Sequence, residues 1–226
     1  MDLSLSEDQN MMIEAARRLV EKHIQPILDR NDRDKGLPKP EVLAILEKAA
    51  DLGLTSARIP ESEGGSGMTM LDYGLIAEQM PPSAAIIVQP HEATTTRIHF
   101  GGTAEQRERF VPDLVAGRRI ACTGSTEPDV GSDPRAIKTT ATADGDSVVI
   151  NGRKQWISNS PVCDVMNVTC RIANGEGTFR LMRVLVDRAE STFEAREVAM
   201  HGLRQAPLGE VVFDNCRVPA RNVCPD

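Results

Sequence analysis

The feature that most constrains the fold is a change in hydrophobic spacing near residue 118 of the 226-residue chain. Before that point, apolar residues recur three and four positions apart, as in helices that bury one face. After it, short runs rich in β-branched residues are separated by turn-forming pairs such as Asp144-Gly145. Helices followed by strands, rather than alternating with them, predict an α+β fold. We expect a helical bundle domain over residues 1–118 and an antiparallel β-barrel-like domain over residues 119–226.

Local signals mark the ends of the expected elements. Ser4 or Ser6 can cap the first helix, Thr103 opens the last one with a T-x-x-Q capping box, and Gly53 and Gly117 are helix stops. Five helices are expected to open near residues 8, 40, 70, 84 and 103. Strands are expected over residues 136–143, 147–150, 165–172, 179–186 and 210–213. The pairs Asp144-Gly145, Asn151-Gly152 and Asn174-Gly175 indicate hairpins or tight turns between them.

Composition excludes several classes of protein. The net charge of −7 argues against nucleic acid or an anionic membrane surface as the main partner. No apolar run approaches the roughly 18 residues of a spanning helix, and the N-terminal residues resemble no targeting peptide. Five cysteines without a CxxC pair are typical of reduced thiols, so we expect a cytoplasmic protein. Cys122 is interpreted as a small buried hydrophobic residue.

Three short motifs suggest chemistry that their surroundings do not support. His91-Glu92 begins like a zinc-protease motif, but position 95 is Thr, so we expect no metal site. Residues 64–67 (GGSG) lack the features of a phosphate-binding loop and are interpreted as a flexible turn. No GxSxG nucleophile elbow is present.

Two segments in the second half combine residues that could hold a ligand. Residues 123–133 (TGSTEPDVGSD) place several hydroxyl side chains and two glycines close together. Taken alone, such a loop either binds polar ligand atoms or is a turn capped by its own side chains, and the turn is favoured. Residues 153–159 (RKQWISN) contain Trp156, the only tryptophan. A lone tryptophan in a strand is more often a core residue than a cofactor platform.

Considered together, these segments resemble the acyl-CoA dehydrogenase family. The family pattern TEPxxGSD is matched by residues 126–133, NGxKxWI[ST]N by residues 151–159, and FxxxRVP by residues 213–219. Residues 100–106 are similar to the family's FGxxxQ helix entry. The matches occur in the family's order and cover nearly the whole chain.

The resemblance implies that FAD lies against the β-domain. Ser125 and Thr126 would hydrogen-bond the isoalloxazine ring, Trp156 would pack on it, and Ser158 would lie near its reactive nitrogen. Gly131 and Ser132 would lie near the pyrophosphate or the acyl-CoA tail, with Ser132 also binding substrate. The cofactor-binding residues implied in this way are Thr123, Ser125, Thr126, Gly131, Ser132, Trp156, Ile157 and Ser158.

The implied reaction is α,β-dehydrogenation of an acyl-CoA thioester. A carboxylate removes the α-proton while the β-hydrogen leaves as hydride to FAD. The family's base is usually a Glu in a C-terminal helical domain, which would lie beyond Asp226, so no catalytic residue is assigned in this chain. Glu127 is interpreted as a structural carboxylate of its loop. An electron-transfer flavoprotein or another acceptor would take the electrons.

Several alternatives stay open. The chain could be a fragment, one half of a split enzyme, or a degenerate protein. Its partner is expected to be another copy in a homo-oligomer, or a second chain that carries the C-terminal domain. A non-catalytic binding or scaffold protein, or a flavin oxidase of the same fold, would share these motifs. The Ala206-Pro207 variant in residues 202–209 is similar to a branch that takes long or modified acyl chains, and residues 123–125 are more polar than is common.

Overall fold

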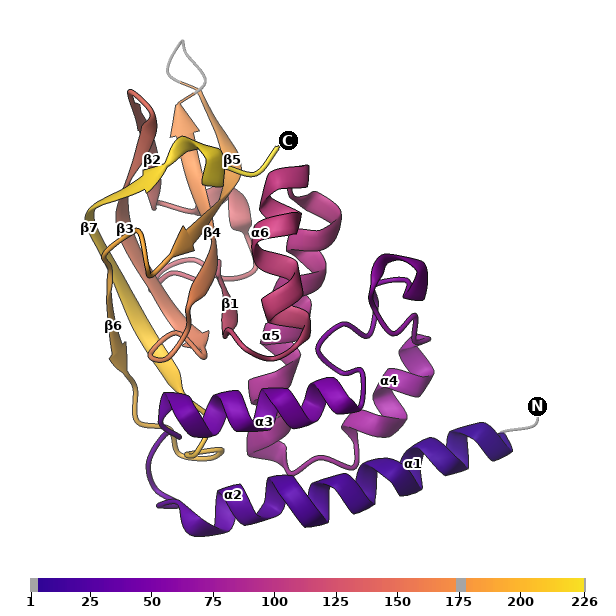
Figure 1. Cartoon of the computed structure of the whole chain (residues 1–226). Helices are drawn as coiled ribbons and strands as arrows, with labels where there is room; N and C mark the ends of the chain where they lie inside the picture. Colours follow the sequence, from indigo (N-terminus) through magenta and orange to yellow (C-terminus); the bar gives the residue numbers. More distant parts are fainter. Residues whose placement is uncertain (1–3, 174–177, 226) are drawn as a thin grey trace.

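The computed structural model describes residues 4–173 and 178–225. A helical half and a curled sheet lie side by side (Figure 1). The helices formed by residues 82–101 and 104–115 lie against the sheet. The helices are α1 (Glu7–Leu19), α2 (Gln25–Arg30), α3 (Lys39–Asp51), α4 (Met70–Ala77), α5 (Pro82–Gly101) and α6 (Ala104–Val115). The helical half expected from the sequence is confirmed.

The helix boundaries follow the local signals. Ser6 caps α1 with a capping box, and Thr103 caps α6 in the same way. The first helix continues through a π-helical stretch, Val20–Ile24, into α2. The sequence pattern predicted neither the π-helical stretch nor α2. Gly53 and Gly117 both have positive φ, as expected of residues that stop a helix.

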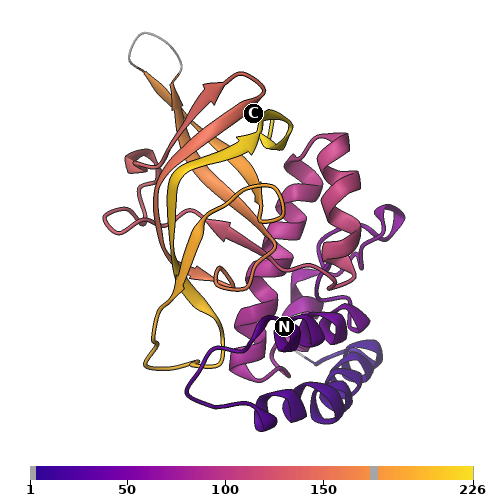
Figure 2. The same ribbon diagram turned by 60° about the vertical axis from the view of Figure 1, so that its left-hand side comes forward.

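The sheet contains seven strands in the described residues. They are β1 (Ala121–Gly124), β2 (Thr140–Asp144), β3 (Ser147–Ser158), β4 (Val165–Ala173), β5 (Phe179–Asp187), β6 (Glu194–Glu197) and β7 (Leu208–Pro219). Their order is β1-β4-β2-β3-β7-β6, with β5 also paired to β4, and the sheet curls around its own axis (Figure 2). The α+β fold is confirmed. Most pairs are antiparallel, whereas β1 and β2 both run parallel to β4.

Strand β4 shares one edge between two partners. Its residues 165–168 pair with β1, and Arg171 and Ile172 pair with the start of β2. The other edge pairs with β5 over its whole length. The sheet therefore forks along β4, and the chain from residue 125 to residue 139 leaves the sheet within this fork.

One expected turn is wrong. Asp144-Gly145 does turn the chain between β2 and β3, with Gly145 at φ 58°. Asn151-Gly152 instead lies inside β3, where the register with β7 shifts between Ile150 and Gly152. Gly152 has φ 150°, and a Cβ there would lie 2.7 Å from the Thr139 Cα. Asn151-Gly152 therefore forms a β-bulge rather than a turn, and the bulge uses the backbone freedom of the glycine. Asn174-Gly175 lies outside the described residues.

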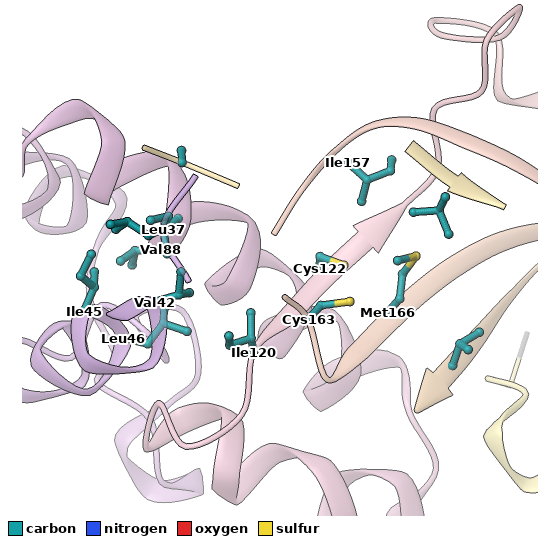
Figure 3. Close-up of a cluster of buried hydrophobic side chains, with 14 of the residues drawn as sticks. Leu37, Val42, Ile45, Leu46, Val88, Ile120, Cys122, Ile157, Cys163 and Met166 are labelled. Atoms are coloured by element: carbon teal, nitrogen blue, oxygen red, sulfur yellow. The ribbon is translucent and has the colours of Figure 1, made fainter. Parts of the chain in front are cut away.

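The larger of two hydrophobic clusters in the described residues runs through both halves (Figure 3). It includes Val42, Ile45 and Leu46 from α3 and Val88 from α5. From the other half it includes Cys122, Ile157 and Met166 of the strands, and Ile120 and Cys163 just outside them. Cys122 is fully buried, as the sequence predicted. Because one cluster spans the junction, the division into domains 1–118 and 119–226 stays a prediction.

Buried His91 connects three elements at this junction. Its Nε2 lies 2.8 Å from the Leu114 carbonyl oxygen in α6, and its Nδ1 accepts the Ala121 N–H of β1 at 3.1 Å. The ring is therefore neutral, with its proton on Nε2. Burial lowers the pKa of His91 to about 4. Both ring nitrogens are used to hold α5, α6 and β1 together.

Replacing Gly152 with Ala should destabilise the protein by about 2–4 kcal/mol, because the added methyl group meets the Thr139 backbone. Gly131→Ala is the matched control, since a Cβ at Gly131 meets nothing within 4 Å. Its free energy of unfolding should stay within about 0.5 kcal/mol of the wild type. Urea unfolding measures both, and equal stability of the two variants would contradict the bulge assignment.

His91 should make stability depend on pH. The pKa of His91 is about 4 in the folded protein, against an ordinary value of 6.5. The neutral ring therefore contributes its full stabilisation above pH 6.5, and this contribution is lost as the pH falls towards 4. Between pH 7 and 5 the wild type should lose about 2 kcal/mol more than the non-titrating variant His91→Gln. Parallel pH profiles for the two proteins in urea unfolding would refute this.

Candidate active site

The fold brings the two motif segments together. The Gln155 N–H donates to the Thr126 carbonyl oxygen at 2.9 Å. One residue earlier, the Lys154 ammonium donates to the Ser125 carbonyl oxygen at 3.1 Å. The hydroxyl-rich loop that follows β1 therefore lies directly beside the part of β3 that carries Trp156.

A buried ion pair holds this arrangement. The Lys154 Nζ lies 2.9 Å from the Glu127 Oε1, and the two side chains are 0% and 4% exposed. Glu127 also accepts from the Thr139 hydroxyl at 2.6 Å, the Thr139 N–H at 2.9 Å and the Lys138 N–H at 2.7 Å. Both oxygens of the carboxylate are occupied, which confirms the interpretation of Glu127 as a structural residue of its loop.

The surroundings of the pair fix its charge state. Burial raises the pKa of Glu127, but the hydrogen bonds from Thr139, Lys154 and Lys138 outweigh it, so the pKa lies below its ordinary value. Burial lowers the pKa of Lys154, and Glu127 opposes this shift. A carboxylate with a lowered pKa and four hydrogen-bond donors is poorly suited to removing a proton from a substrate.

Trp156 lies in a strained stretch of β3. Its φ is 60°, a conformation that bulky residues rarely adopt, and the ladder with β7 is irregular between Lys154 and Ile157. Asn159, three residues on, also has positive φ. The distortion leaves Lys154 and Ile157 buried while Trp156 is 54% exposed. The core alternative for Trp156 is therefore wrong, and the indole is available to a flat ligand.

A network of hydroxyl groups lies between α5 and the sheet. The Thr123 Oγ1 lies 2.8 Å from the Thr94 Oγ1 and accepts from the Arg97 guanidinium at 3.0 Å. Farther along, the Ser125 and Thr169 hydroxyls lie 3.0 Å apart. Sequence reasoning missed Thr94, Arg97 and Thr169. The one available signal was the placement of Thr94 and Arg97 one turn apart on the expected fourth helix.

Asn167 adds an unusual polar group to this region. It pairs in register with Thr123, so both side chains lie on the same face of the sheet. The residue is 1% exposed, and its carboxamide has no hydrogen-bond partner within the part of the chain that the structure describes. Buried polar groups are normally paired, so the unpaired carboxamide is an unusual feature of this face of the sheet.

The remaining predicted site residues differ in exposure. Ile157 is buried in the core, so its side chain faces away from any surface ligand. Ser158 is half-buried at the end of β3. Gly131 and Ser132 lie on the exposed part of the loop. Ser125, Thr126 and Trp156 are brought together, whereas Gly131 and Ser132 lie farther along the loop.

This geometry fits a flavin. An exposed aromatic ring beside a hydroxyl-rich loop offers one face for stacking and several donors for ring heteroatoms. Among the described residues, no group of three or more His, Cys, Asp or Glu side chains could hold a metal ion. The same residues contain no helix long and apolar enough to cross a bilayer.

Comparisons with known proteins match both halves. Residues 6–118 match the model of the acyl-CoA dehydrogenase N-terminal domain, and residues 122–216 match that of the acyl-CoA dehydrogenase middle domain. The chain belongs to the acyl-CoA dehydrogenase family. FAD is the cofactor of this family.

Individual relatives extend beyond the length of this chain. The NADH-dependent acryloyl-CoA reductase of Anaerotignum propionicum is 30% identical over 99% of this chain and 57% of its own. A structure described for the electron transferring flavoprotein of Acidaminococcus fermentans has a TM-score of 0.87 at 26% identity, covering 100% of this chain and 60% of that one. A glutaryl-CoA dehydrogenase from Mycobacterium smegmatis in complex with FADH2 has a TM-score of 0.83 at 27% identity, covering 97% and 55%. This acyl-CoA dehydrogenase-family chain thus spans less than two thirds of these relatives.

Removing the buried ammonium should cost far more than removing an exposed one. Lys154→Met leaves Glu127 buried without its counter-ion, so the free energy of unfolding should fall by about 3–5 kcal/mol. Lys138→Met removes an ion pair of the same 2.9 Å length that is exposed to solvent, and should leave stability almost unchanged. Guanidinium unfolding of both variants measures this, and a similar small loss in each would contradict the role given to the pair.

Proposed function

We propose that this chain forms the flavin-facing part of an FAD-dependent enzyme that introduces an α,β double bond into an acyl-CoA thioester. The observation that carries the proposal is the exposed, strained Trp156 lying beside the Ser125–Thr126 loop. Membership of the acyl-CoA dehydrogenase family supports it. A cytoplasmic location and the division into domains 1–118 and 119–226 are proposed on the sequence evidence.

Each residue has a proposed part in this site. Trp156 stacks on the isoalloxazine ring, Ile157 offers its backbone, and Ser158 donates from the end of β3. Ser125 and Thr126 bind the edge of the ring, and Thr123 lies next to them on β1. Bound FAD accepts the electrons that leave the substrate. Donors fixed by a rigid scaffold stabilise the negative charge that develops, because they need no reorganisation. Gly131 and Ser132, on the exposed loop, are proposed to contact the pyrophosphate or the substrate tail.

The catalytic base is proposed to lie outside this chain. Both carboxylate oxygens of Glu127 already accept structural hydrogen bonds. We therefore propose that a Glu from a C-terminal domain removes the α-proton. That domain would come from a longer form of the protein or from a second chain, and a homo-oligomer is the other proposed partner. Electron-transfer flavoprotein or another acceptor is proposed to take the electrons from the reduced enzyme.

A second candidate function is a non-catalytic binding or scaffold role on the same fold. The full engagement of Glu127 favours it for this chain taken alone, since the motif's own carboxylate is not free to act. A flavin oxidase would share every feature of the flavin-facing surface. The proposal of dehydrogenation therefore depends on the flavin and substrate assay.

The test is titration of the purified chain with FAD, followed at about 450 nm, before and after addition of an acyl-CoA panel. The wild type should take up FAD, and Trp156→Ala should weaken its binding about tenfold through loss of ring stacking. Trp156→Phe is the matched control and should retain most of the affinity. Bleaching by an acyl-CoA should require the C-terminal domain to be supplied. Equal FAD affinity for Trp156→Ala and the wild type would refute the assigned site.

A further inference from the structure

One arginine lies at the end of the hydroxyl network, where α5 meets the candidate site. Arg97 is exposed on α5, and its Nη1 donates to the Thr123 Oγ1 at 3.0 Å. This is the one hydrogen bond that Arg97 forms among the described residues, and its guanidinium is paired with no carboxylate in the same part of the chain. Because a guanidinium carries five N–H donors, most of those of Arg97 are available to a ligand.

The hydrogen bonds of the network fix the position of this arginine. The Thr94 hydroxyl donates its one proton to the Pro90 carbonyl oxygen at 2.7 Å. At the 2.8 Å contact between the two threonine hydroxyls, Thr123 is therefore the donor and Thr94 the acceptor. The Thr123 oxygen in turn accepts from Arg97. The positive charge is thus held by α5 and β1 together, beside the hydroxyl-rich loop that follows β1.

The order of the residues along this loop gives a bound thioester a direction. Residues 131–132, which are proposed to contact the pyrophosphate or the substrate tail, follow the ring-binding pair Ser125–Thr126 and lie on the exposed part of the loop. Thr123 precedes that pair on β1 and contacts α5. If the CoA end of the thioester is directed towards the exposed loop, its acyl end is directed towards α5 and Arg97.

An uncharged hydrocarbon chain is a poor occupant of this position. Alkyl groups packed against the Arg97 guanidinium would take its N–H groups out of water without giving them acceptors, and this costs free energy. An anionic oxygen group replaces those lost hydrogen bonds with charge-assisted ones. The planar fork of arginine matches the oxygens of a carboxylate or a phosphate. Such a site selects a substrate by attraction and also by the cost of leaving its own charge unpaired.

We propose that Arg97 binds an anionic group, a carboxylate or a phosphate ester, on the acyl chain of the substrate. The inference rests on the proposed function, because it needs the thioester to lie beside the flavin-facing loop, and it names the class of acyl-CoA that the site takes. Thr123 and Thr94 position the arginine through their hydroxyls. The polar character of β1 at Thr123 follows from this role, since its oxygen holds the guanidinium.

The test compares thioesters that share one acyl chain length and differ at its end. Pentanoyl-CoA is uncharged there, glutaryl-CoA ends in a carboxylate, and 5-phosphooxypentanoyl-CoA ends in a phosphate ester. Titration calorimetry measures their dissociation constants with the purified chain in saturating FAD. The wild type should bind at least one anionic thioester about tenfold more tightly than pentanoyl-CoA. Arg97→Met should bind all of them alike, and Arg97→Lys should keep part of the preference, because it keeps the charge without the fork.

Arg107→Met is the matched control. Arg107 is also exposed on a helix, and its Nη1 also donates to an uncharged oxygen, the Gly102 carbonyl oxygen at 3.3 Å, but it lies on α6. This variant should keep the wild-type preference for an anionic acyl chain. Urea unfolding shows whether each variant is folded.

The outcomes separate this inference from the proposed function. Equal binding of all the thioesters by the wild type, a preference that persists in Arg97→Met, or no binding of any thioester overturns the inference. An equal loss for every thioester in Arg97→Met assigns the arginine to the CoA part and also overturns it. FAD uptake and bleaching judge the proposed function without this result. A preference that depends on Arg97 in a chain that takes up no FAD supports the assignment of Arg97 while the proposed function fails.

Discussion

The arrangement of the candidate site depends on the buried pair of Lys154 and Glu127. Neither charge is exposed to water, so each needs the other and the donors around it. The donors come from Thr139 and Lys138, at the far end of the loop that Glu127 begins. A different path for this loop would leave an unpaired charge inside the protein. The pair therefore specifies one loop conformation, and through Gln155 that conformation is tied to β3.

The irregularities of strand β3 decide which of its side chains lie in the core and which lie at the surface of the site. A bulge at Gly152 and a second break before Ile157 alter which residues face inward. Regular alternation would put Lys154 and Trp156 on the same face, but the strained backbone buries one and exposes the other. A positive φ at Trp156 costs free energy, and the fold tolerates it because Lys154 before it and Ile157 after it are held in the interior. Strain of this kind is typical of residues placed for binding.

The sequence predicted what local chemistry determines. The capping box of Thr103, the stop at Gly53 and the change of spacing near residue 118 are short-range signals, and each matched the structure. The four-residue strands β1 and β6 carry too little pattern to be recognised. Asn151-Gly152 satisfied a turn signal, yet its conformation depends on β7 and Thr139, which are distant in sequence. Likewise, Lys154 and Glu127 are 27 residues apart, so their pairing could not be read from spacing. The family motifs indicated that the two segments carry the site, while the roles of its residues stay predictions.

The fork along β4 has a consequence for how such a protein can diverge. Both ends of the segment from residue 125 to residue 139 are anchored in a ladder, one through β1 and one through β2, while its exposed middle pairs with none of the strands in the described part of the chain. Insertions or deletions in that middle would change the contour of the candidate site without changing the pairing of any strand in the sheet. Natural variation in ligand preference can accumulate there while the scaffold is inherited unchanged.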